Sequence, residues 1–181
     1  MDVHVVGGGV AGGTCAKILA KEGLRVLLSE EDEVIGHPKH CTGILSVRAF
    51  NEAGGYADII MNELRGSTIV GPNGVRWHVR RPEVQAYVVD RPALDRRVVE
   101  EALSEGATLE TRKIRGREDL RGRYVVGADG PHSTVARIHG MKPLREVVVG
   151  YQEVIRVKTE PLDEVVVYLD QNLFPGFFGW R

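Results

Sequence analysis

The sequence contains few cysteines, few aromatic residues and no excess of charge of either sign. Two cysteines among 181 residues, Cys15 and Cys41, cannot make a disulfide framework, which favours a reducing compartment. Phe, Trp and Tyr together make up 6% of the chain. Because 24 basic residues face 25 acidic ones, for a net charge of −1, nucleic acid is not an expected partner.

Long apolar runs are also missing. Residues 5–16 form the longest uncharged stretch near the start, and this stretch is too short and too rich in glycine to span a bilayer. A strand pattern begins at residue 3, so we expect no secretory signal before it. These absences predict a cytoplasmic protein, and any membrane association would be peripheral.

Glycine is abundant, with 22 residues, whereas an average protein has about 7%. The glycines gather at 7–13, 54–55, 127–130 and 176–179. Such clusters occur where the backbone must turn tightly or approach another group closely, and two of the four carry the functional argument below.

Apolar periodicity gives the order of elements. We expect strands over 3–6, 25–29, 67–70, 75–79, 108–111 and 124–126 and helices over 11–21, 46–53, 90–105 and 133–139. Asn73-Gly74 indicates a hairpin. Beyond Pro143, β-branched runs at 147–157 and 165–169 predict another sheet. The sequence thus predicts an α/β protein: a Rossmann-like βαβ domain over 1–65 and 82–143, and the beginning of an antiparallel β domain over 66–81 and 144–181.

A glycine motif follows the first predicted strand. Gly7, Gly9 and Gly12 have the GxGxxG spacing, in which the first permits the turn, the second admits a pyrophosphate and the third lets helix pack on strand. The helix N-terminus offers free N–H groups to the phosphates. Glu30 ends the second strand, where a carboxylate accepts a ribose 2′-OH and would repel a 2′-phosphate. The pattern predicts an adenine dinucleotide without a 2′-phosphate, either FAD or NAD.

A second motif, Gly-Ala-Asp-Gly-Pro-His-Ser at 127–133, follows a later strand and precedes a helix. Taken alone, it also fits an Asx turn with a helix cap. Together with the first motif it resembles the flavoprotein group of p-hydroxybenzoate hydroxylase, which implies FAD and places the Asp-Gly pair near its pyrophosphate. Arg91, at the head of a predicted helix, matches that group's FAD-contacting arginine, although a solvated arginine fits equally well.

Residues 37–43 narrow the resemblance. Pro38-x-x-Cys41-x-Gly43, with Tyr87, Arg91 and Asp95 and the later motif, resembles the geranylgeranyl reductase family. That family uses FAD to reduce isolated double bonds of prenyl chains in archaeal membrane lipids or chlorophyll side chains. A stretch that lines its lipid tunnel corresponds to 175–180, where Phe178 replaces the family's tyrosine. The resemblance covers the whole chain but only the family's N-terminal part.

The resemblance implies site residues position by position. The adenosine and pyrophosphate of FAD would contact Gly7, Gly9, Ala11, Gly12, Glu30, Arg91 and Ile114. The flavin would contact the backbone of Cys41, Thr42 and Gly43, and Asp129 and Gly130 would close the other side of the FAD site. Phe178 and Trp180 would border the prenyl substrate. Alkene reduction needs a proton donor as well as a hydride, so Cys41 is a catalytic candidate, with flavin positioning as its alternative role.

A metal site is not expected. His37, His40 and Cys41 lie close in sequence, but no fourth ligand follows at a suitable spacing. No motif selects the electron donor, so NAD(P)H and ferredoxin both fit. Two other functions stay open: a quinone-linked dehydrogenase or aromatic hydroxylase, and a truncated, non-catalytic FAD-binding module.

The family's late Gly-Asp motif, which binds the ribityl chain, does not occur here. Moreover, Phe174, Phe177, Phe178 and Trp180 crowd the last eight residues, and dense exposed aromatics mark an interface. We therefore expect a further C-terminal segment or a partner chain to complete the fold. Activity of these residues alone, and their oligomeric state, are not predicted.

Overall fold

A computed structural model describes residues 1–142, 144–156, 158 and 161–181. The chain folds into two compact units. The first combines Met1–Cys41 with Asp90–Arg145, and the second combines Thr42–Val89 with Glu146–Arg181. These units differ from the predicted domains, because residues 42–65 and 82–89 belong to the second. The predicted domain boundaries stay a prediction, and Pro143 at one of them lies outside the described residues.

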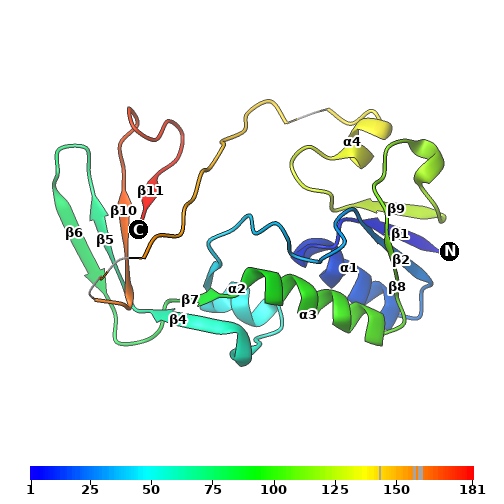
Figure 1. The fold of residues 1–181 in the computed structure, drawn as a ribbon, viewed down its shortest axis with the longest axis horizontal. Coiled ribbons are helices and arrows are strands. Elements are labelled where there is room, and N and C mark those ends of the chain that lie inside the picture. Colours follow the sequence, from blue (N-terminus) through cyan, green and yellow to red (C-terminus); the bar gives the residue numbers. More distant parts are fainter. Residues whose placement is uncertain (143, 157, 159–160) are drawn as a thin grey trace. The chain divides into compact units, whose positions relative to one another are not determined.

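The first unit is built on a parallel sheet with the strand order β8-β2-β1-β9 (Figure 1). Its strands are β1 (Val3–Val6), β2 (Val26–Glu30), β8 (Thr108–Thr111) and β9 (Tyr124–Gly127). All four were predicted within one or two residues. Parallel strands need a crossover, and α1 (Val10–Lys21) supplies it between β1 and β2, which confirms the predicted βαβ opening.

Helix α3 (Arg91–Ser104) packs against α1 in this unit. A Cβ on Gly13 would lie 2.8 Å from Val98 Cγ2, so the glycine permits the close approach of the two helices. Lys17 Nζ donates to Glu101 Oε2 at 2.9 Å across the same contact. The apolar core lies between the helices and the sheet, and it includes Val5, Ala16, Leu28, Val99 and Ala102.

A buried histidine links three strands of this sheet. His4 is 0% exposed, and its Nδ1 accepts the Arg121 N–H at 3.0 Å. Its Nε2 therefore carries the proton and donates to Ser29 Oγ at 2.7 Å, which in turn donates to Glu110 Oε1 at 2.7 Å. Burial, the largest cause, lowers the pKa of His4 below 6.5, with Arg121 and Arg112 also lowering it and Glu110 opposing them.

The remaining elements of the first unit lie after β8. They are the short 3₁₀ helix η2 (Arg117–Asp119) and α4 (Thr134–Ile138). Val6, Ile114 and Val135 form a second buried cluster, which packs α4 and the β8–β9 connection against β1. The predicted helix over 133–139 is confirmed, and Ser133 caps it by accepting the Ala136 N–H at 2.9 Å.

The second unit contains two sheets. In the first, β7 (Ala86–Val89) pairs antiparallel with β3 (Ile44–Ser46) and β4 (Ile60–Leu64). The second has the order β11-β10-β5-β6, with β5 (Gly66–Val70), β6 (Arg76–Arg80), β10 (Glu164–Tyr168) and β11 (Gly179–Trp180). The second unit also contains α2 (Val47–Glu52) and the 3₁₀ helix η1 (Ala57–Ile59). The hairpin at Asn73-Gly74 is confirmed.

Two details of this unit differ from the sequence prediction. β10 pairs parallel with β5, although its pairing with β11 is antiparallel; β5 and β10 are far apart in the chain, so no hairpin turn fixes their direction. The strand expected over 147–157 is absent from described residues 147–156, and Val157 lies outside them. Val149 and Val154 are 91% and 87% exposed there, so these side chains find no sheet to pack on within the described chain.

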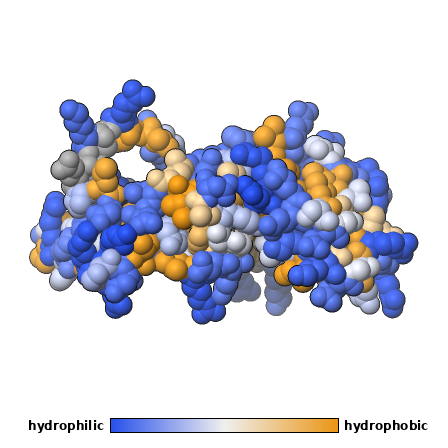
Figure 2. Space-filling model, turned by 90° about the horizontal axis from the view of Figure 1, so that it is seen from below, coloured by the Kyte–Doolittle hydropathy of each residue, from blue (hydrophilic) through white to orange (hydrophobic). Residues whose placement is uncertain are grey.

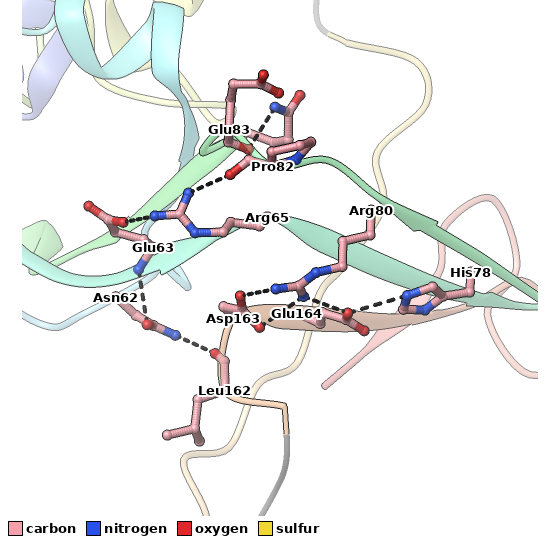
Figure 3. Close-up of polar contacts among 11 residues, drawn as sticks. Asn62, Glu63, Arg65, His78, Arg80, Pro82, Glu83, Leu162, Asp163 and Glu164 are labelled. Carbon is pink, nitrogen blue, oxygen red and sulfur yellow. Dashed lines mark hydrogen bonds and ion pairs between the residues drawn. The ribbon is translucent and has the colours of Figure 1, made fainter.

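A polar network joins β6 to β10 across β5 (Figure 3). The Arg80 guanidinium donates to Asp163 Oδ2 at 2.6 Å and to Glu164 Oε1 at 2.9 Å, and His78 Nε2 lies 3.4 Å from the same Glu164 oxygen. Gly66 lies between Arg80 and Glu164 in the register. Since Gly66 has no side chain, the arginine can reach across the middle strand.

The surface carries apolar residues in several places. On the face drawn in Figure 2, orange apolar residues lie among blue polar ones. Exposed large apolar residues include Met61, Trp77, Val79 and Leu173. Among the helices of the described chain, none has both the length and the apolar composition needed to cross a membrane.

Candidate functional site

The glycine loop between β1 and α1 has the geometry of a phosphate cradle. Gly7 has a φ of +106°, and a Cβ there would overlap the Ala128 carbonyl. A Cβ on Gly12 would overlap the Gly7 carbonyl oxygen. A Cβ on Gly9, in contrast, would meet nothing within 4 Å. The first and third glycines thus close the loop on itself, and the second leaves open space beside its backbone.

Glu30 joins this loop from the end of β2. Its Oε2 accepts the Gly8 N–H at 2.5 Å, and its Oε1 accepts the N–H groups of Glu31 and Asp32 at 2.6 and 3.0 Å. A carboxylate has about four lone-pair positions, so three backbone donors leave room for a further hydroxyl donor. The carboxylate is also held in place, which suits recognition of a ribose.

A cavity of about 360 Å³ lies on one side of the loop. Five of the predicted residues line it: Gly7, Gly9, Glu30, Ile114 and Asp129. Ile114 is buried, at 6% exposure, whereas Lys113 at the same cavity pairs with Glu31 at 2.6 Å. An apolar floor with charged residues around it fits a nucleoside, which has a flat base and a polar sugar.

The connection that supplies Ile114 is held by Asp119. Its carboxylate accepts the Arg112 side chain and the N–H groups of Arg115 and Gly116. These contacts lower the pKa of Asp119 to about 2, with the Arg112 side chain as the largest cause. The carboxylate is therefore charged at neutral pH and keeps the wall of the cavity in one conformation.

A smaller cavity of about 200 Å³ shares Gly9 and Glu30 with the larger one, and Cys41, Arg91 and Asp95 also line it. Gly36 allows the loop before Cys41 to approach the start of α3 closely, because a Cβ on Gly36 would lie 2.7 Å from Pro92 Cα. The loop that ends at Cys41 can therefore lie directly on the start of α3, beside Arg91.

Arg91 has an unused donor in this cavity. Its Nη2 donates to Asp95 Oδ1 at 3.2 Å, whereas its buried Nε has no hydrogen-bond partner. Burial by itself lowers the pKa of Arg91, but Asp95 and Cys41 outweigh it and raise that pKa above the ordinary value. A guanidinium that stays charged and has a free donor beside a phosphate cradle fits an anionic ligand.

Asp129 and Gly130 follow β9. Asp129 accepts the Ser133 hydroxyl at 2.5 Å and the N–H groups of Thr134 and Val135 at 2.7 and 3.1 Å. It therefore caps α4 as well as lining the larger cavity. Gly130 has a φ of +78° and supplies the turn that brings the chain from β9 into α4, but it does not line either cavity.

The other predicted residues lie in the second unit. Thr42 and Gly43 precede β3, and the Gly43 carbonyl accepts the Val89 N–H at 2.9 Å. Phe178 and Trp180 line a cavity of about 570 Å³. The Phe177 and Phe178 rings stack at 4.2 Å, and Trp180 meets Phe178 edge-on at 6.1 Å. Aromatic rings on one side of a cavity favour an apolar ligand.

Comparison with known proteins shows which of them this chain resembles. Residues 5–38 match the NAD(P)-binding Rossmann-like domain. The chain is 30% identical, over 99% of its length, to digeranylgeranylglycerophospholipid reductase 1 of Methanopyrus kandleri, of which it covers 53%. It is 31% identical, over 77% of its length, to an uncharacterized protein in the nifH2 5′ region of Methanosarcina barkeri, of which it covers 88%.

A solved structure agrees with these relatives. Over 99% of its length the chain superposes on a geranylgeranyl bacteriochlorophyll reductase-like protein of Thermoplasma acidophilum, with a TM-score of 0.76 and 27% identity. The chain thus resembles proteins named as geranylgeranyl reductases over nearly its whole length. It spans about half the length of the Methanopyrus relative and of the Thermoplasma structure, 53% and 52%.

Within this fold, the predicted residues fall into three groups. Gly7, Gly9, Ala11, Gly12, Glu30, Cys41, Arg91, Ile114, Asp129 and Gly130 all belong to the first unit, and eight of them form or line the loop and its two cavities. Ala11 lies in the first turn of α1, and Gly130 shapes the turn before α4. Thr42, Gly43, Phe178 and Trp180 belong to the second unit.

Sequence reasoning missed one contact of this site. Asp95 Oδ1 accepts the Val10 N–H at 3.1 Å as well as the Arg91 guanidinium, and only Arg91 lies at the i,i+4 spacing that a sequence can show. Val10 and Asp95 are 85 positions apart, so no local sequence pattern predicts their hydrogen bond. Among the described residues, no group of three His, Cys, Asp or Glu side chains lies close enough to hold a metal ion.

Proposed function

We propose that the protein is an FAD-dependent oxidoreductase that reduces C=C double bonds of geranylgeranyl chains, as in archaeal membrane lipid biosynthesis. The observation that carries this proposal is the alignment of 99% of the chain with a digeranylgeranylglycerophospholipid reductase. The first unit independently supports the binding of FAD, because the open space at Gly9 adjoins cavities of about 200 and 360 Å³ and Arg91 Nε there has no hydrogen-bond partner.

The first unit would bind the adenosine and pyrophosphate of FAD. Gly9 leaves space for the phosphates, and the N–H groups in the first turn of α1 point toward them, Ala11 and Gly12 among them. Glu30 would accept a ribose hydroxyl, and Arg91 would donate its unused Nε–H to a phosphate.

Seven more residues complete the proposed site around this core. Ile114 would contact the adenine through its backbone. Asp129 and Gly130, between β9 and α4, would close the site near the pyrophosphate. Gly7 would hold the turn open, since its positive φ suits only glycine. The backbone of Cys41, Thr42 and Gly43 would meet the flavin ring.

Reduction of an isolated alkene adds a hydride to one carbon and a proton to the other. Bound FAD, once reduced, supplies the hydride. Cys41 lines the smaller cavity together with Arg91, and we propose its thiol as the group that delivers the proton to the second carbon. The reductant of FAD is left open between NAD(P)H and ferredoxin.

The prenyl chain would bind in the aromatic cavity of the second unit. Its lining of Phe178, Trp180 and neighbouring apolar residues would exclude water from the chain. Because such substrates partition into membranes, we propose a cytoplasmic protein in peripheral contact with the bilayer. The part of the relatives beyond this chain's coverage would come from a further segment or a partner chain.

The test is alkene reduction by the purified chain. The chain is loaded with FAD, reduced with dithionite without oxygen and incubated with a geranylgeranyl phospholipid. Mass spectrometry then follows the addition of two hydrogens per double bond. Saturated product that is absent from a Cys41→Ser control would support both the reaction and the proton donor. A chain that binds FAD but saturates no double bond would contradict the reductase and leave a flavin-binding module.

A further inference from the structure

A single carboxylate oxygen joins the N-termini of two helices at the smaller cavity. Asp95 Oδ1 accepts the N–H of Val10, the first residue of α1, at 3.1 Å. The same oxygen accepts Nη2 of Arg91, the first residue of α3, at 3.2 Å. Asp95 is only 8% exposed, so water competes weakly for these two bonds.

The first bond determines which N–H groups of α1 stay available. The first turn of a helix has N–H groups with no partner inside the helix, and these attract anions. Because Asp95 takes the Val10 N–H, a pyrophosphate beside Gly9 is left with the N–H groups of Ala11 and Gly12. The carboxylate thereby sets where on the helix end a phosphate can bind.

The second bond fixes the Arg91 guanidinium. Its five N–H donors lie in one plane with fixed directions, so holding Nη2 also sets the direction of Nε–H. That Nε is buried and has no protein partner. Without Asp95 the long arginine side chain would regain rotamer freedom, and a ligand would then have to restrict it on binding.

The charges of Asp95 and Arg91 are also compatible with a pyrophosphate in this cavity. A lone carboxylate next to a pyrophosphate would repel it, but Asp95 is neutralised by Arg91, with side-chain exposures of 11% and 23%. The pair also lines the cavity with Gly8 and Gly9. Burial strengthens such a pair relative to one on the surface.

We propose that Asp95 is a positioning residue for the dinucleotide: it orients Arg91 toward the pyrophosphate and reserves the Ala11 and Gly12 N–H groups for it. This inference rests on the proposed FAD binding. Asp95 itself does not touch the ligand and acts through Arg91 and through the end of α1.

The chain offers a matched control. Glu101, on the same helix, also ties α3 to α1, through Lys17, but neither cavity includes it. The apo chain and its D95A, D95N and E101A variants are titrated with FAD and followed by flavin fluorescence. Thermal unfolding without FAD shows whether each variant is folded.

D95A is expected to weaken FAD binding about ten-fold or more, which is typical of losing charged hydrogen bonds. D95N should fall in between, because its carbonyl oxygen still accepts both bonds without the charge. E101A should bind FAD like the wild type. If D95A does not fold, D95N carries the comparison, and an unchanged FAD affinity in D95N would overturn the proposal.

A double variant separates positioning from general stability. If Asp95 acts through Arg91, D95A should weaken binding less in an R91Q background than in the wild type. Equal losses in both backgrounds would overturn the orientation of Arg91 by Asp95 and leave the bond to the Val10 N–H as the cause. A folded wild-type chain that binds no FAD would overturn the proposed function as well, whereas wild-type binding with normal affinity in both Asp95 variants would overturn this inference alone.

Discussion

The two units differ in how completely their strands are covered. In the first, every residue of β1 is at most 5% exposed, and the strand has a parallel neighbour on each side. In the second, all five residues of β6 are exposed. Residues 147–156 contain no strand, although their sequence is rich in β-branched residues.

The difference in coverage shows which unit buries its apolar side chains within itself. The first unit packs its own strands and helices around a buried core, and the two cavities at the glycine loop are lined by its own residues. The second unit displays apolar side chains, of which Val149 and Val154 are the most exposed, and exposed apolar surface of this kind is typical of interfaces. We therefore expect substitutions in the first unit to affect stability more.

The largest effect is expected from Gly12→Ala. The new Cβ would overlap the Gly7 carbonyl oxygen, which is backbone and cannot move aside, so we expect a loss of about 3 kcal/mol or more. Urea unfolding followed by circular dichroism measures it. Gly150→Ala in the second unit is the control, because a Cβ there meets nothing within 4 Å. Equal unfolding midpoints for the two variants would contradict the expectation that substitutions in the first unit affect stability more.

His4 should give the next largest effect. His4→Ala leaves the Arg121 N–H and Ser29 Oγ without their partner in a buried site, which we expect to lower stability by about 2–4 kcal/mol. The same urea experiment measures this loss. A variant that unfolds at the wild-type midpoint would show that the buried network does not stabilise the sheet.

The wild-type chain should also lose stability in acid because of His4. Its folded pKa is lowered below 6.5, so the unfolded chain binds the proton first, and stability falls as the pH drops from about 6.5 toward the folded pKa. Urea midpoints at several pH values for wild type and His4→Gln measure this. Parallel loss in both proteins would show that other groups cause it.

Asp129→Ala should have a moderate effect. The variant removes three acceptor bonds at the start of α4, and loss of a helix cap lowers stability by about 1–2 kcal/mol. Asp129→Asn, which keeps an acceptor oxygen, should recover part of it. Differential scanning calorimetry of the three proteins is the measurement, and an Asn variant as unstable as the Ala variant would argue against capping.

The smallest effect is expected from Arg80→Met in the second unit. The side chains of Arg80 and Asp163 are 43% and 30% exposed, so their ion pair is screened by solvent. Glu164 is only 8% exposed, but it keeps His78 Nε2 at 3.4 Å when the arginine is replaced. The variant should unfold close to the wild type, and any difference should vanish at about 1 M salt. A loss larger than that of Asp129→Ala would contradict the contrast between the units.

Local sequence signals predict most of the first unit. Gly7 must be glycine because of its φ of +106°, and Gly12 because a Cβ there would overlap the Gly7 carbonyl oxygen. Both reasons lie within a turn of a few residues. Glu30 follows because the end of β2 must lie beside the loop that ends β1 in a parallel pair. These features are encoded within about thirty residues, so a single sequence contains them.

Contacts between distant residues could not be predicted in the same way. The Asp95 bond to Val10 and the Ser29 bond to Glu110 depend on tertiary packing across 85 and 81 positions. The parallel pairing of β10 with β5 could not be predicted from the sequence either, because the periodicity of a strand does not specify the direction of its neighbour. Apolar periodicity over 147–156 indicates a strand, yet a strand forms only where a partner is available.

The central claim is that the first unit is a preformed FAD site, and titration of the purified chain with FAD tests it most directly. Wild type, Gly9→Ala and Gly150→Ala are compared, since neither new Cβ meets a protein atom within 4 Å. The account predicts saturable binding of one FAD by wild type and Gly150→Ala, and binding at least about ten-fold weaker by Gly9→Ala. Folded wild-type chain that binds no FAD, or Gly9→Ala that binds it as tightly as wild type, would contradict the account.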